Sequence, residues 1–400
     1  MAHPERTEGP TGTRRVGIVG AGQLARMLCE AASELGVETI VLAEREDDAA
    51  TGVGSEIRIG SPRDPGALLG LAQSCDVVTF DHELVDLDAI GSLEAQGLVV
   101  RPGAAALEVA VDKSIQRRRF AGWGLPVPAF CVLDGTVVDD LAALRSFADR
   151  IGAVPVVKAA RGGYDGRGVV VASSIDDATA AVSAWRADGV HVVAEEPVAF
   201  RRELAALVAR RPGGETAAWR TVETAQVGGV CREVRVPGNV DDATAGVAAD
   251  LAGRVAEVTG AVGVLAVELF DTDEGLIVNE VAMRPHNSGH WTIEGATTSQ
   301  FENHLRAVFD LPLGATDLVA AAVATVNVFG ADHGGCADPL AAALAEPTAK
   351  VHLYGKAPRP GRKLGHVTVI GDDPSGVATR AWHAAGALGT PGSDRAEVAT

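Results

Sequence analysis

The sequence predicts an α/β protein of several domains that begins with a parallel, doubly wound sheet. The chain has 400 residues, more than one ordinary domain holds. Near its start, a short apolar strand at 16–19, an amphipathic helix at 23–35 and a second strand at 39–43 follow one another, which is the rhythm of parallel strands joined by helices. From 203 to 236, apolar and polar residues instead alternate between turns, as in antiparallel strands. We therefore expect a parallel unit first and an antiparallel unit later.

The remaining elements follow in chain order. Residues 1–13 are polar and rich in Gly and Pro, which predicts a disordered leader. A further strand at 76–80 runs into the acidic turn Asp81-His-Glu83. Beyond Arg101-Pro-Gly we expect a basic helix, three short strands, a long amphipathic helix and a hairpin, at 112–122, 154–158, 169–171, 191–194, 242–259, and 262–270 with 276–280. A short mixed segment and a loose tail from about 381 complete the chain.

Composition excludes several function classes. The formal charge of −18 would repel nucleic acid and anionic membranes. The five Cys are scattered singly without paired spacing, which argues against a disulfide framework and fits a reducing cytosol. No apolar run is long enough to span a membrane, and the first residues lack a signal-peptide core. We expect a soluble, cytoplasmic protein.

The first glycine turn allows three interpretations. Gly20-Ala-Gly22-Gln-Leu-Ala25 follows a strand and opens a helix, and Glu44 closes the next strand. This is a dinucleotide fingerprint, in which helix N-terminal amides cradle a phosphate. The turn could instead bind another phosphate or a ribose, or only let strand and helix pack closely.

A second glycine-rich stretch, 158–168, lies between two predicted strands. It reads KAARGGYDGRG, and no Gly-Lys-Ser/Thr occurs anywhere in the chain, so it is not a Walker loop. Its exposed amides, with Lys158 and Arg167, predict a flap that closes over a triphosphate, although a mobile surface hairpin is the plain alternative. The strand before Glu195-Glu196-Pro197 suits an adenine hinge, and Glu203 could accept from ribose hydroxyls.

Two glutamates of the predicted hairpin are candidate metal ligands. If Phe270 pairs with Leu276, Glu268 and Glu280 become diagonal neighbours on one face, about 7–8 Å apart at the backbone, near enough to share Mg²⁺. The neighbouring residues are apolar, so an unpaired Glu on that face would be costly to bury. The alternative, that both face solvent, stays open.

Two polar segments follow the hairpin. Residues 283–292, MRPHNSGHWT, offer few apolar anchors and predict a substrate loop. Zinc binding by His286 and His290 is disfavoured because neither Cys nor a third ligand stands nearby. The basic stretch 354–366 in an acidic protein suits a phosphomonoester, although a solvated turn remains possible.

Taken together, these segments resemble the ATP-grasp superfamily and, within it, the 5-(carboxyamino)imidazole ribonucleotide synthases of purine biosynthesis. The resemblance covers roughly 14–370 and rests on motifs in the family's order: GAGQLARM (20–27), GGYDGRG (162–168), NE (279–280), RPHNSGHWT (284–292), YGK (354–356) and PGRKLGH (360–366). It implies a leader at 1–13, a Rossmann-like pre-ATP-grasp domain at 14–111, an ATP-grasp domain at 112–312, a small C-terminal domain at 313–380 and a tail at 381–400. The implied cofactors are ATP and Mg²⁺, the substrates bicarbonate and aminoimidazole ribonucleotide, and the usual assembly a homodimer.

The resemblance also implies roles for residues at matched positions. The implied ATP contacts are Lys113, Lys158, Gly163, Tyr164, Asp165, Gly166, Arg167, Gly168, Glu195, Glu196, Val198, Glu203, Gln226, Asn279 and Glu280. The implied metal ligands are Glu268 and Glu280. The implied ribonucleotide contacts are Gly22, Gln23, Asp81, Glu83, Arg284, His286, Asn287, Ser288, Lys356, Arg362 and Lys363. Tyr164, Asp165 and His286 are the implied catalytic residues, with Asp165 or His286 positioning or deprotonating the amine.

Two positions depart from the family pattern. Gln226 stands where the family often has His, and Asp81 replaces the first Glu of its E-x-E turn. Three rival functions are a formate-using glycinamide ribonucleotide transformylase of the same superfamily, an NAD(P)-dependent oxidoreductase built on the first glycine turn, and a non-catalytic nucleotide-binding regulator.

Overall fold

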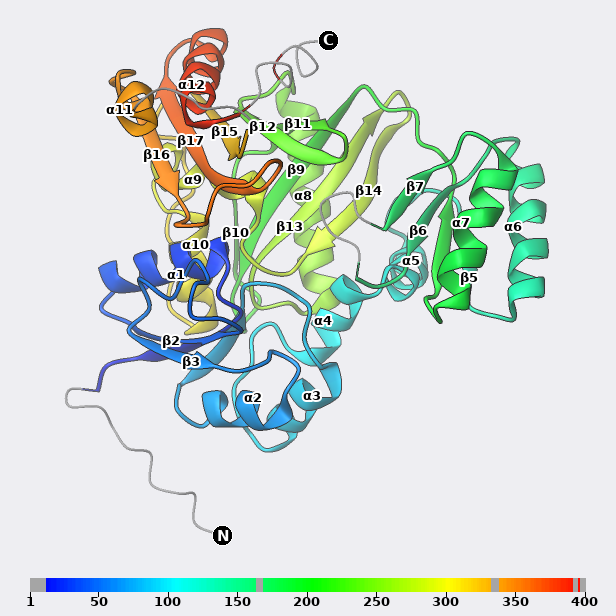
Figure 1. Ribbon diagram of the computed structural model, residues 1–400, viewed down its shortest axis with the longest axis horizontal. Coiled ribbons are helices and arrows are strands. Elements are labelled where there is room, and N and C mark those ends of the chain that lie inside the picture. Colours follow the sequence, from blue (N-terminus) through cyan, green and yellow to red (C-terminus); the bar gives the residue numbers. More distant parts are fainter. Residues whose placement is uncertain (1–11, 163–167, 332–337, 391–394, 396–400) are drawn as a thin grey trace.

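The computed structural model describes residues 12–162, 168–331, 338–390 and 395, arranged around three sheets (Figure 1). The predicted parallel unit is confirmed: its sheet has the strand order β3-β2-β1-β4. Its elements are β1 (Arg15–Val19), α1 (Gln23–Glu34), β2 (Glu38–Ala43), β3 (Glu56–Ile59), α2 (Pro65–Ala72), β4 (Val77–Phe80) and α3 (Leu87–Ala95). The strands β1 and β4 are apolar on both faces because α1 covers one face and α2 and α3 the other.

A small antiparallel unit carries the glycine flap. Its sheet order is β5-β8-β6-β7, and α6 and α7 pack on one face of it, on the right in Figure 1. The elements are β5 (Phe130–Leu133), α6 (Val137–Ile151), β6 (Val156–Ala159), β7 (Val169–Val171), α7 (Ile175–Ala187) and β8 (Val192–Glu195). The strands β6 and β7 pair antiparallel, which confirms that 158–168 connects a hairpin and is not a strand-to-helix loop. Its residues 163–167 lie outside the described part of the chain.

The largest sheet has nine strands and runs through the middle of the molecule. Its order is β14-β13-β9-β11-β12-β15-β17-β16, with β10 beside β9. The strands are β9 (Arg202–Arg210), β10 (Thr216–Ala218), β11 (Val222–Val227), β12 (Val230–Val236), β13 (Gly263–Thr272), β14 (Gly275–Ala282), β15 (Ala322–Phe329), β16 (Ala349–Leu353) and β17 (Lys363–Gly371). The helical elements are α4 (Ala104–Val111), α5 (Lys113–Gly122), α8 (Asp242–Thr259), η1 (Asn287–Gly289), α9 (Thr292–Gly295), α10 (Gln300–Val308), α11 (Pro339–Leu344) and α12 (Pro374–Leu388).

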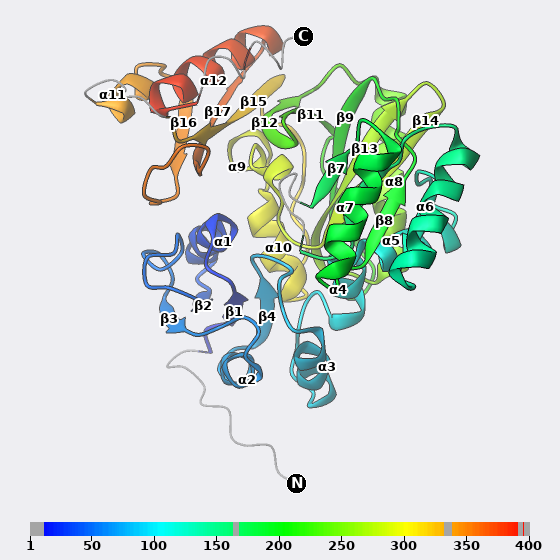
Figure 2. The same cartoon turned by 45° about the vertical axis from the view of Figure 1, so that its right-hand side comes forward.

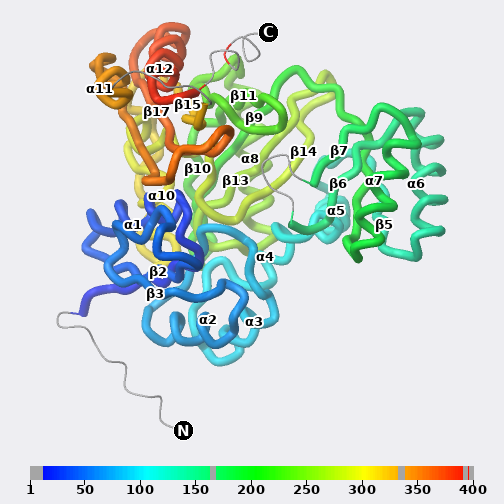
Figure 3. Tube along the Cα trace, in the orientation of Figure 1, coloured from blue at the N-terminus to red at the C-terminus, as the bar shows by residue number. Residues whose placement is uncertain are grey.

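Helices cover both faces of this sheet. Along β13, Leu265, Val267 and Leu269 pack against α8, whereas Val264 and Ala266 lie in the cluster that contains Trp291. The first unit and the C-terminal helices lie on one side of the central strands and the flap unit on the other, as the turned view in Figure 2 and the chain trace in Figure 3 show. The central strands therefore separate the flap unit from the first unit and the C-terminal helices.

A buried histidine joins the first sheet to the central nine-stranded sheet. His304 on α10 lies 2.7 Å from Thr79 of β4 through Nε2, and its Nδ1 accepts from the N–H of Val264 on β13 at 3.0 Å. Burial lowers the pKa of His304 to about 3, so the ring is neutral at physiological pH. His304 is fully buried, and a Cβ at Gly263 would stand 2.8 Å from its Cε1, so glycine at 263 makes room for the ring.

The structure corrects two sequence-based expectations. The predicted hairpin register is wrong: Phe270 pairs with Ile277, and a bulge at Asn279 brings Glu280 directly opposite Glu268. The predicted tail at 381–400 is partly wrong, because α12 continues to Leu388 and buries Trp382 against the sheet. The predicted leader falls almost wholly outside the described residues.

Candidate active site

The paired glutamates of the β13–β14 hairpin form the centre of the site. Because Glu268 and Glu280 are a cross-strand pair, both side chains leave the same face, opposite the face that Leu269 and Val278 present to α8. The prediction that the two carboxylates share a face is therefore confirmed, although its register was wrong. Burial, and then the neighbouring Glu280, raise the pKa of Glu268 to about 8. Two such carboxylates need a cation between or beside them.

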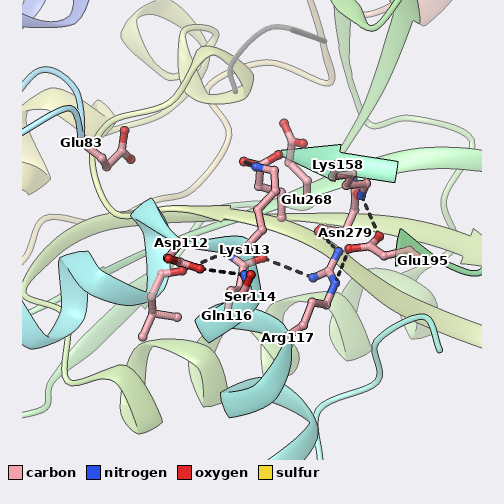
Figure 4. Close-up of polar contacts among 12 residues, drawn as sticks. Glu83, Asp112, Lys113, Ser114, Gln116, Arg117, Lys158, Glu195, Glu268 and Asn279 are labelled. Atoms are coloured by element: carbon pink, nitrogen blue, oxygen red, sulfur yellow. Dashed lines mark hydrogen bonds and ion pairs between the residues drawn. The ribbon is translucent and has the colours of Figure 1, made fainter. Parts of the chain in front are cut away.

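Helix α5 supplies that face with two cations. Its N-cap is Asp112, whose carboxylate accepts from the N–H groups of Ser114 and Ile115. Lys113, one residue on, reaches Glu280 with its Nζ 2.5 Å from Oε1. Lys113 and Arg117 are four residues apart and therefore project from one side of the helix toward the hairpin, as Figure 4 shows. The pKa of Glu280 is consequently held below its usual value, despite burial, by Lys113 and then Lys158.

A buried ion-pair network positions Lys158, the first residue of the flap segment 158–168. Glu195 on β8 accepts from Arg117 Nε at 2.7 Å and pairs with Lys158 Nζ at 2.8 Å, and all three side chains are at most about one-tenth exposed (Figure 4). Lys158 Nζ also lies 3.2 Å from Asn279 Oδ1, and Arg117 donates to the Asn279 carbonyl at 2.6 Å. Burial opposes ionisation of Glu195, but the two cations hold its pKa at about 2. The Glu195 carboxylate is thus held by Arg117 and Lys158, and in its sheet Glu195 lies in register with Phe130 and Val156.

The other predicted nucleotide contacts lie at the edges of this face. Glu203, paired with Phe270 across β9 and β13, accepts from Gln226 Nε2 at 2.7 Å. Burial raises the pKa of Glu203 to about 7. Glu196 is exposed, and its N–H donates to the carbonyl of Ala129. Gln226, which departs from the family pattern, therefore holds the carboxylate expected at the ribose.

The predicted substrate loop joins the first unit to the hairpin. Glu83 accepts from Arg284 Nε at 2.7 Å and from the Met283 N–H at 3.3 Å. His286 follows, with Nε2 3.5 Å from Glu268 Oε1 and Nδ1 accepting from the Ser288 N–H. Burial, then Arg284 and Lys363, lower the pKa of His286 to about 3, so its ring is neutral with the proton on Nε2. A neutral ring of such low basicity positions groups by hydrogen bonding and is a poor proton acceptor.

The basic C-terminal segment reaches the same loop from the other side. Lys363 Nζ contacts Asn287 Oδ1, and Lys356 Nζ lies 2.6 Å from Gln23 Oε1 at the start of α1. Arg362 instead donates to the Ala357 carbonyl near the surface. Two of the three predicted cations of this segment are thus brought to the substrate loop or the first glycine turn.

Two amides of the first glycine turn are already bonded to a carboxylate. Asp81 Oδ2 accepts from the Gly22 N–H at 2.6 Å, and Oδ1 accepts from the Ala25 N–H at 2.9 Å. A Cβ at Gly22 would stand 2.5 Å from Asp81 Oδ2. Gly22 is therefore required for this carboxylate cap, which takes the place that a dinucleotide phosphate would need.

Sequence reasoning missed three residues of the site. Arg117, Asp112 and Arg161 were not predicted, although Arg161 pairs with Asp112 at 2.7 Å at the start of the flap. The spacing of Lys113 and Arg117 on one helix face was the available signal. Five predicted residues, Gly163, Tyr164, Asp165, Gly166 and Arg167, lie outside the described part of the chain, while Gly168 closes the hairpin through its carbonyl and the Ala159 N–H.

Comparisons with known proteins identify the family. Three family models match successive parts of the chain: the ribonucleotide synthetase preATP-grasp domain at 13–111, the ATP-grasp domain at 118–301 and the phosphoribosylaminoimidazole carboxylase C-terminal domain at 323–380. The chain is 48% identical over 381 residues to the N5-carboxyaminoimidazole ribonucleotide synthase of Mycobacterium bovis, covering 92% of this chain and 86% of that protein. It is 42% identical over 368 residues to that of Corynebacterium ammoniagenes, covering 90% and 88%.

Solved structures give the same result. The N5-carboxyaminoimidazole synthase of Aspergillus clavatus, in complex with ADP and 5-aminoimidazole ribonucleotide, superposes with a TM-score of 0.84 at 32% identity, over 94% of this chain and 98% of that one. The Thermus thermophilus enzyme gives a TM-score of 0.82 at 37% identity, over 94% and 99%. The chain therefore belongs to the N5-carboxyaminoimidazole ribonucleotide synthase family of ATP-grasp proteins.

Proposed function

We propose that this chain is an ATP-dependent carbon–nitrogen ligase that joins bicarbonate to the amine of 5-aminoimidazole ribonucleotide. The products are 5-(carboxyamino)imidazole ribonucleotide, ADP and phosphate, and the step belongs to purine biosynthesis. Family membership supports the reaction. The observation that carries it is the pair Glu268 and Glu280 facing each other beside Lys113 and Lys158.

The residues present fit a magnesium ion. None of the described residues forms a group of three or more His, Cys, Asp or Glu able to hold a metal alone. Mg²⁺ is commonly held by one or two carboxylates together with substrate phosphates, which matches Glu268 and Glu280 with Asn279 beside them. The raised pKa of Glu268 marks a carboxylate that lacks a sufficient counter-charge. When bound, the ion would neutralise charge on the ATP phosphates.

The chain's own residues would then act in sequence. Lys158, held by Glu195 and Asn279, and Lys113, which now neutralises Glu280, would bind the phosphates and stabilise developing charge. A bicarbonate oxygen attacks the γ-phosphorus, giving carboxyphosphate and ADP. Carboxyphosphate is readily hydrolysed, so closure of the flap at 162–168 over the site would exclude water.

Carboxylation completes the reaction. Carboxyphosphate collapses to CO₂ and phosphate beside the ribonucleotide, whose amine attacks the carbon of CO₂ and loses one proton. We infer that His286, neutral with its proton on Nε2, orients the carboxylating group, and that Asp165 is the better candidate for accepting the proton. Arg284, Lys356 and Lys363 would hold the ribonucleotide, with Glu83 fixing Arg284.

The rivals differ in their substrates. A glycinamide ribonucleotide transformylase would use formate in place of bicarbonate. An NAD(P)-dependent oxidoreductase would need the helix amides of the first glycine turn, which Asp81 caps.

No described helix is long and apolar enough to cross a membrane. We further propose that the protein is cytoplasmic and that it forms a homodimer. The molar mass measured by light scattering would test the homodimer.

ADP release measured with and without 5-aminoimidazole ribonucleotide tests the proposal. We expect ribonucleotide-stimulated release with bicarbonate and none with formate. A Glu280→Ala variant should lose stimulated turnover, whereas Glu274→Ala, in the exposed hairpin turn, should keep it. Absence of stimulation in the wild-type protein would reject the assignment, and full activity of Glu280→Ala would reject the metal role.

A further inference from the structure

Three histidines stack in a column that lies apart from the glutamate pair. The ring of His366 on β17 lies 4.4 Å from that of His352 on β16 and 4.8 Å from that of His290, with interplanar angles of 10° and 27°. His366 and His290 are fully buried. Burial holds the pKa of both well below the usual value for histidine, so these two rings are neutral and stack without repulsion. A polar ring buried at this cost indicates a specific constraint.

One hydrogen bond fixes the central ring. The Tyr354 hydroxyl lies 2.7 Å from His366 Nδ1, and Tyr354 is itself only 1% exposed. Among the described residues, His366 Nε2 has no hydrogen-bond partner. The rotation of the His366 ring is therefore set by Tyr354 together with the two neighbouring rings.

A β-bulge places Lys363 on the same side of β17 as His366. Lys363 pairs with Phe329 and His366 with Asn327, two residues apart on β15, so both side chains leave one face. In a regular strand, residues three apart point to opposite faces, and here the register shift between Val328 and Phe329 removes that difference. The strand β17 therefore meets the substrate loop twice, through Lys363 at Asn287 and through His366 at His290.

Tyr354 also links the column to the first glycine turn. Two residues beyond Tyr354, Lys356 lies 2.6 Å from Gln23 of the first glycine turn. His352 at the outer end pairs with Glu294 of α9 at 2.6 Å. The column thus connects the substrate loop, β16–β17 and the turn that carries Lys356.

We propose that His366 is a positioning residue for ribonucleotide binding. Through its bond to Tyr354 and its stacking on His290, it fixes the spacing between Lys356 on one side and the Arg284–Asn287 loop with Lys363 on the other. This inference rests on the proposed function, because it takes those cations to be ribonucleotide contacts. His366 touches no reacting group itself, so its effect falls on ribonucleotide affinity and not on ATP binding or the chemical step.

Two variants and a matched control test the column. Tyr354→Phe deletes the hydroxyl and keeps the ring, and His366→Leu removes the ring nitrogens. The control Thr368→Val breaks another buried hydrogen bond, between the Thr325 and Thr368 hydroxyls at 2.8 Å, two residues along the same strand. Each protein is measured by calorimetry for the Kd of 5-aminoimidazole ribonucleotide and of Mg·ADP, and by ADP release for KM and kcat.

We expect Tyr354→Phe and His366→Leu to raise Kd and KM for the ribonucleotide about tenfold, the effect of one lost buried hydrogen bond. The Kd of Mg·ADP and kcat should stay within about twofold, as should every constant of Thr368→Val. Unchanged ribonucleotide affinity in Tyr354→Phe, or equal weakening in Thr368→Val, would overturn the inference. Wild-type binding without turnover would overturn the proposed function alone, and no wild-type binding would overturn both.

Discussion

Replacing Glu195 by Gln tests the ion-pair network that holds Lys158. The shift of the Glu195 pKa from 4.5 to about 2 corresponds to about 3 kcal/mol, at about 1.4 kcal/mol per pH unit. Because the folded-state value is depressed, this contribution is fully present above the unfolded value near 4.5 and is lost progressively as the pH falls from there through about 2. At neutral pH the variant should therefore lose about 3 kcal/mol, within the about 3–5 kcal/mol typical of removing one partner of a buried pair.

The same substitution should weaken nucleotide binding in a pH-dependent way. Burial already lowers the pKa of Lys158, and Glu195 is the largest opposing influence. Without Glu195 the ammonium group loses its proton more readily, so the affinity for Mg·ATP should fall, and the fall should be larger at pH 9 than at pH 7. Affinity in the variant should recover as the pH is lowered from 9 to 7.

Chemical unfolding and calorimetric titration with Mg·ADP measure both effects. Asp134→Asn is the matched control. Asp134 pairs at 2.7 Å with Arg118, which follows Arg117 on α5, and both side chains of this pair are more than one-third exposed. An exposed pair contributes at most about 1 kcal/mol. If Glu195→Gln costs no more than Asp134→Asn and binds Mg·ADP normally, the network does not position Lys158.

Three further outcomes are expected. Because the pKa of Glu268 is raised to about 8, Mg²⁺ affinity should increase between pH 6 and pH 8, and binding should release a proton. Calorimetric titrations in buffers of different ionisation enthalpy would detect the released proton. Binding that does not depend on pH would contradict this prediction. Because folding lowers the pKa of His304 from 6.5 to about 3, the stability of the protein should fall as the pH drops below 6.5. His304→Leu should reduce this pH dependence, yet it should cost about 1–3 kcal/mol at pH 7 because the Val264 N–H is left unpaired. Denaturant midpoints measured across this pH range test both effects. Gly22→Ala, whose Cβ would meet Asp81 Oδ2 at 2.5 Å, should lower the melting temperature by several degrees, whereas Gly70→Ala, in open space, should not.

Local pattern was enough to predict much of the fold. Period-2 and period-3.6 apolar patterns gave α1, α8 and the strands β1 and β13 nearly at their observed bounds. The strand β3, Glu56–Ile59, escaped notice because it has four residues, two of them charged, at the edge of its sheet. The second half of helix α12 falls in the predicted tail because its alanines give little apolar contrast, although Trp382 packs the helix against β15 and β17.

The site was predictable in composition but not in register. Glu268, Glu280 and Lys158 could be named because charged groups interrupt apolar strands. The bulge at Asn279 could not be predicted, since an extra residue in one strand leaves no periodic trace in so short a hairpin. Arg117 was missed because a buried cation on a helix of three consecutive arginines looks like its solvated neighbours until Glu195 is placed beside it.

The nine-stranded sheet has a practical consequence for dissecting the protein. The strands β12 and β15 pair along four residues, so the sheet continues without interruption from the segment matched as the ATP-grasp domain into the one matched as the C-terminal domain. Ending an expressed fragment before residue 322 would leave β12 as an exposed edge strand, whose unpaired N–H and C=O groups are a template for self-association. Fragments and fusions should therefore be cut in the outer loops, and the two segments kept on one polypeptide.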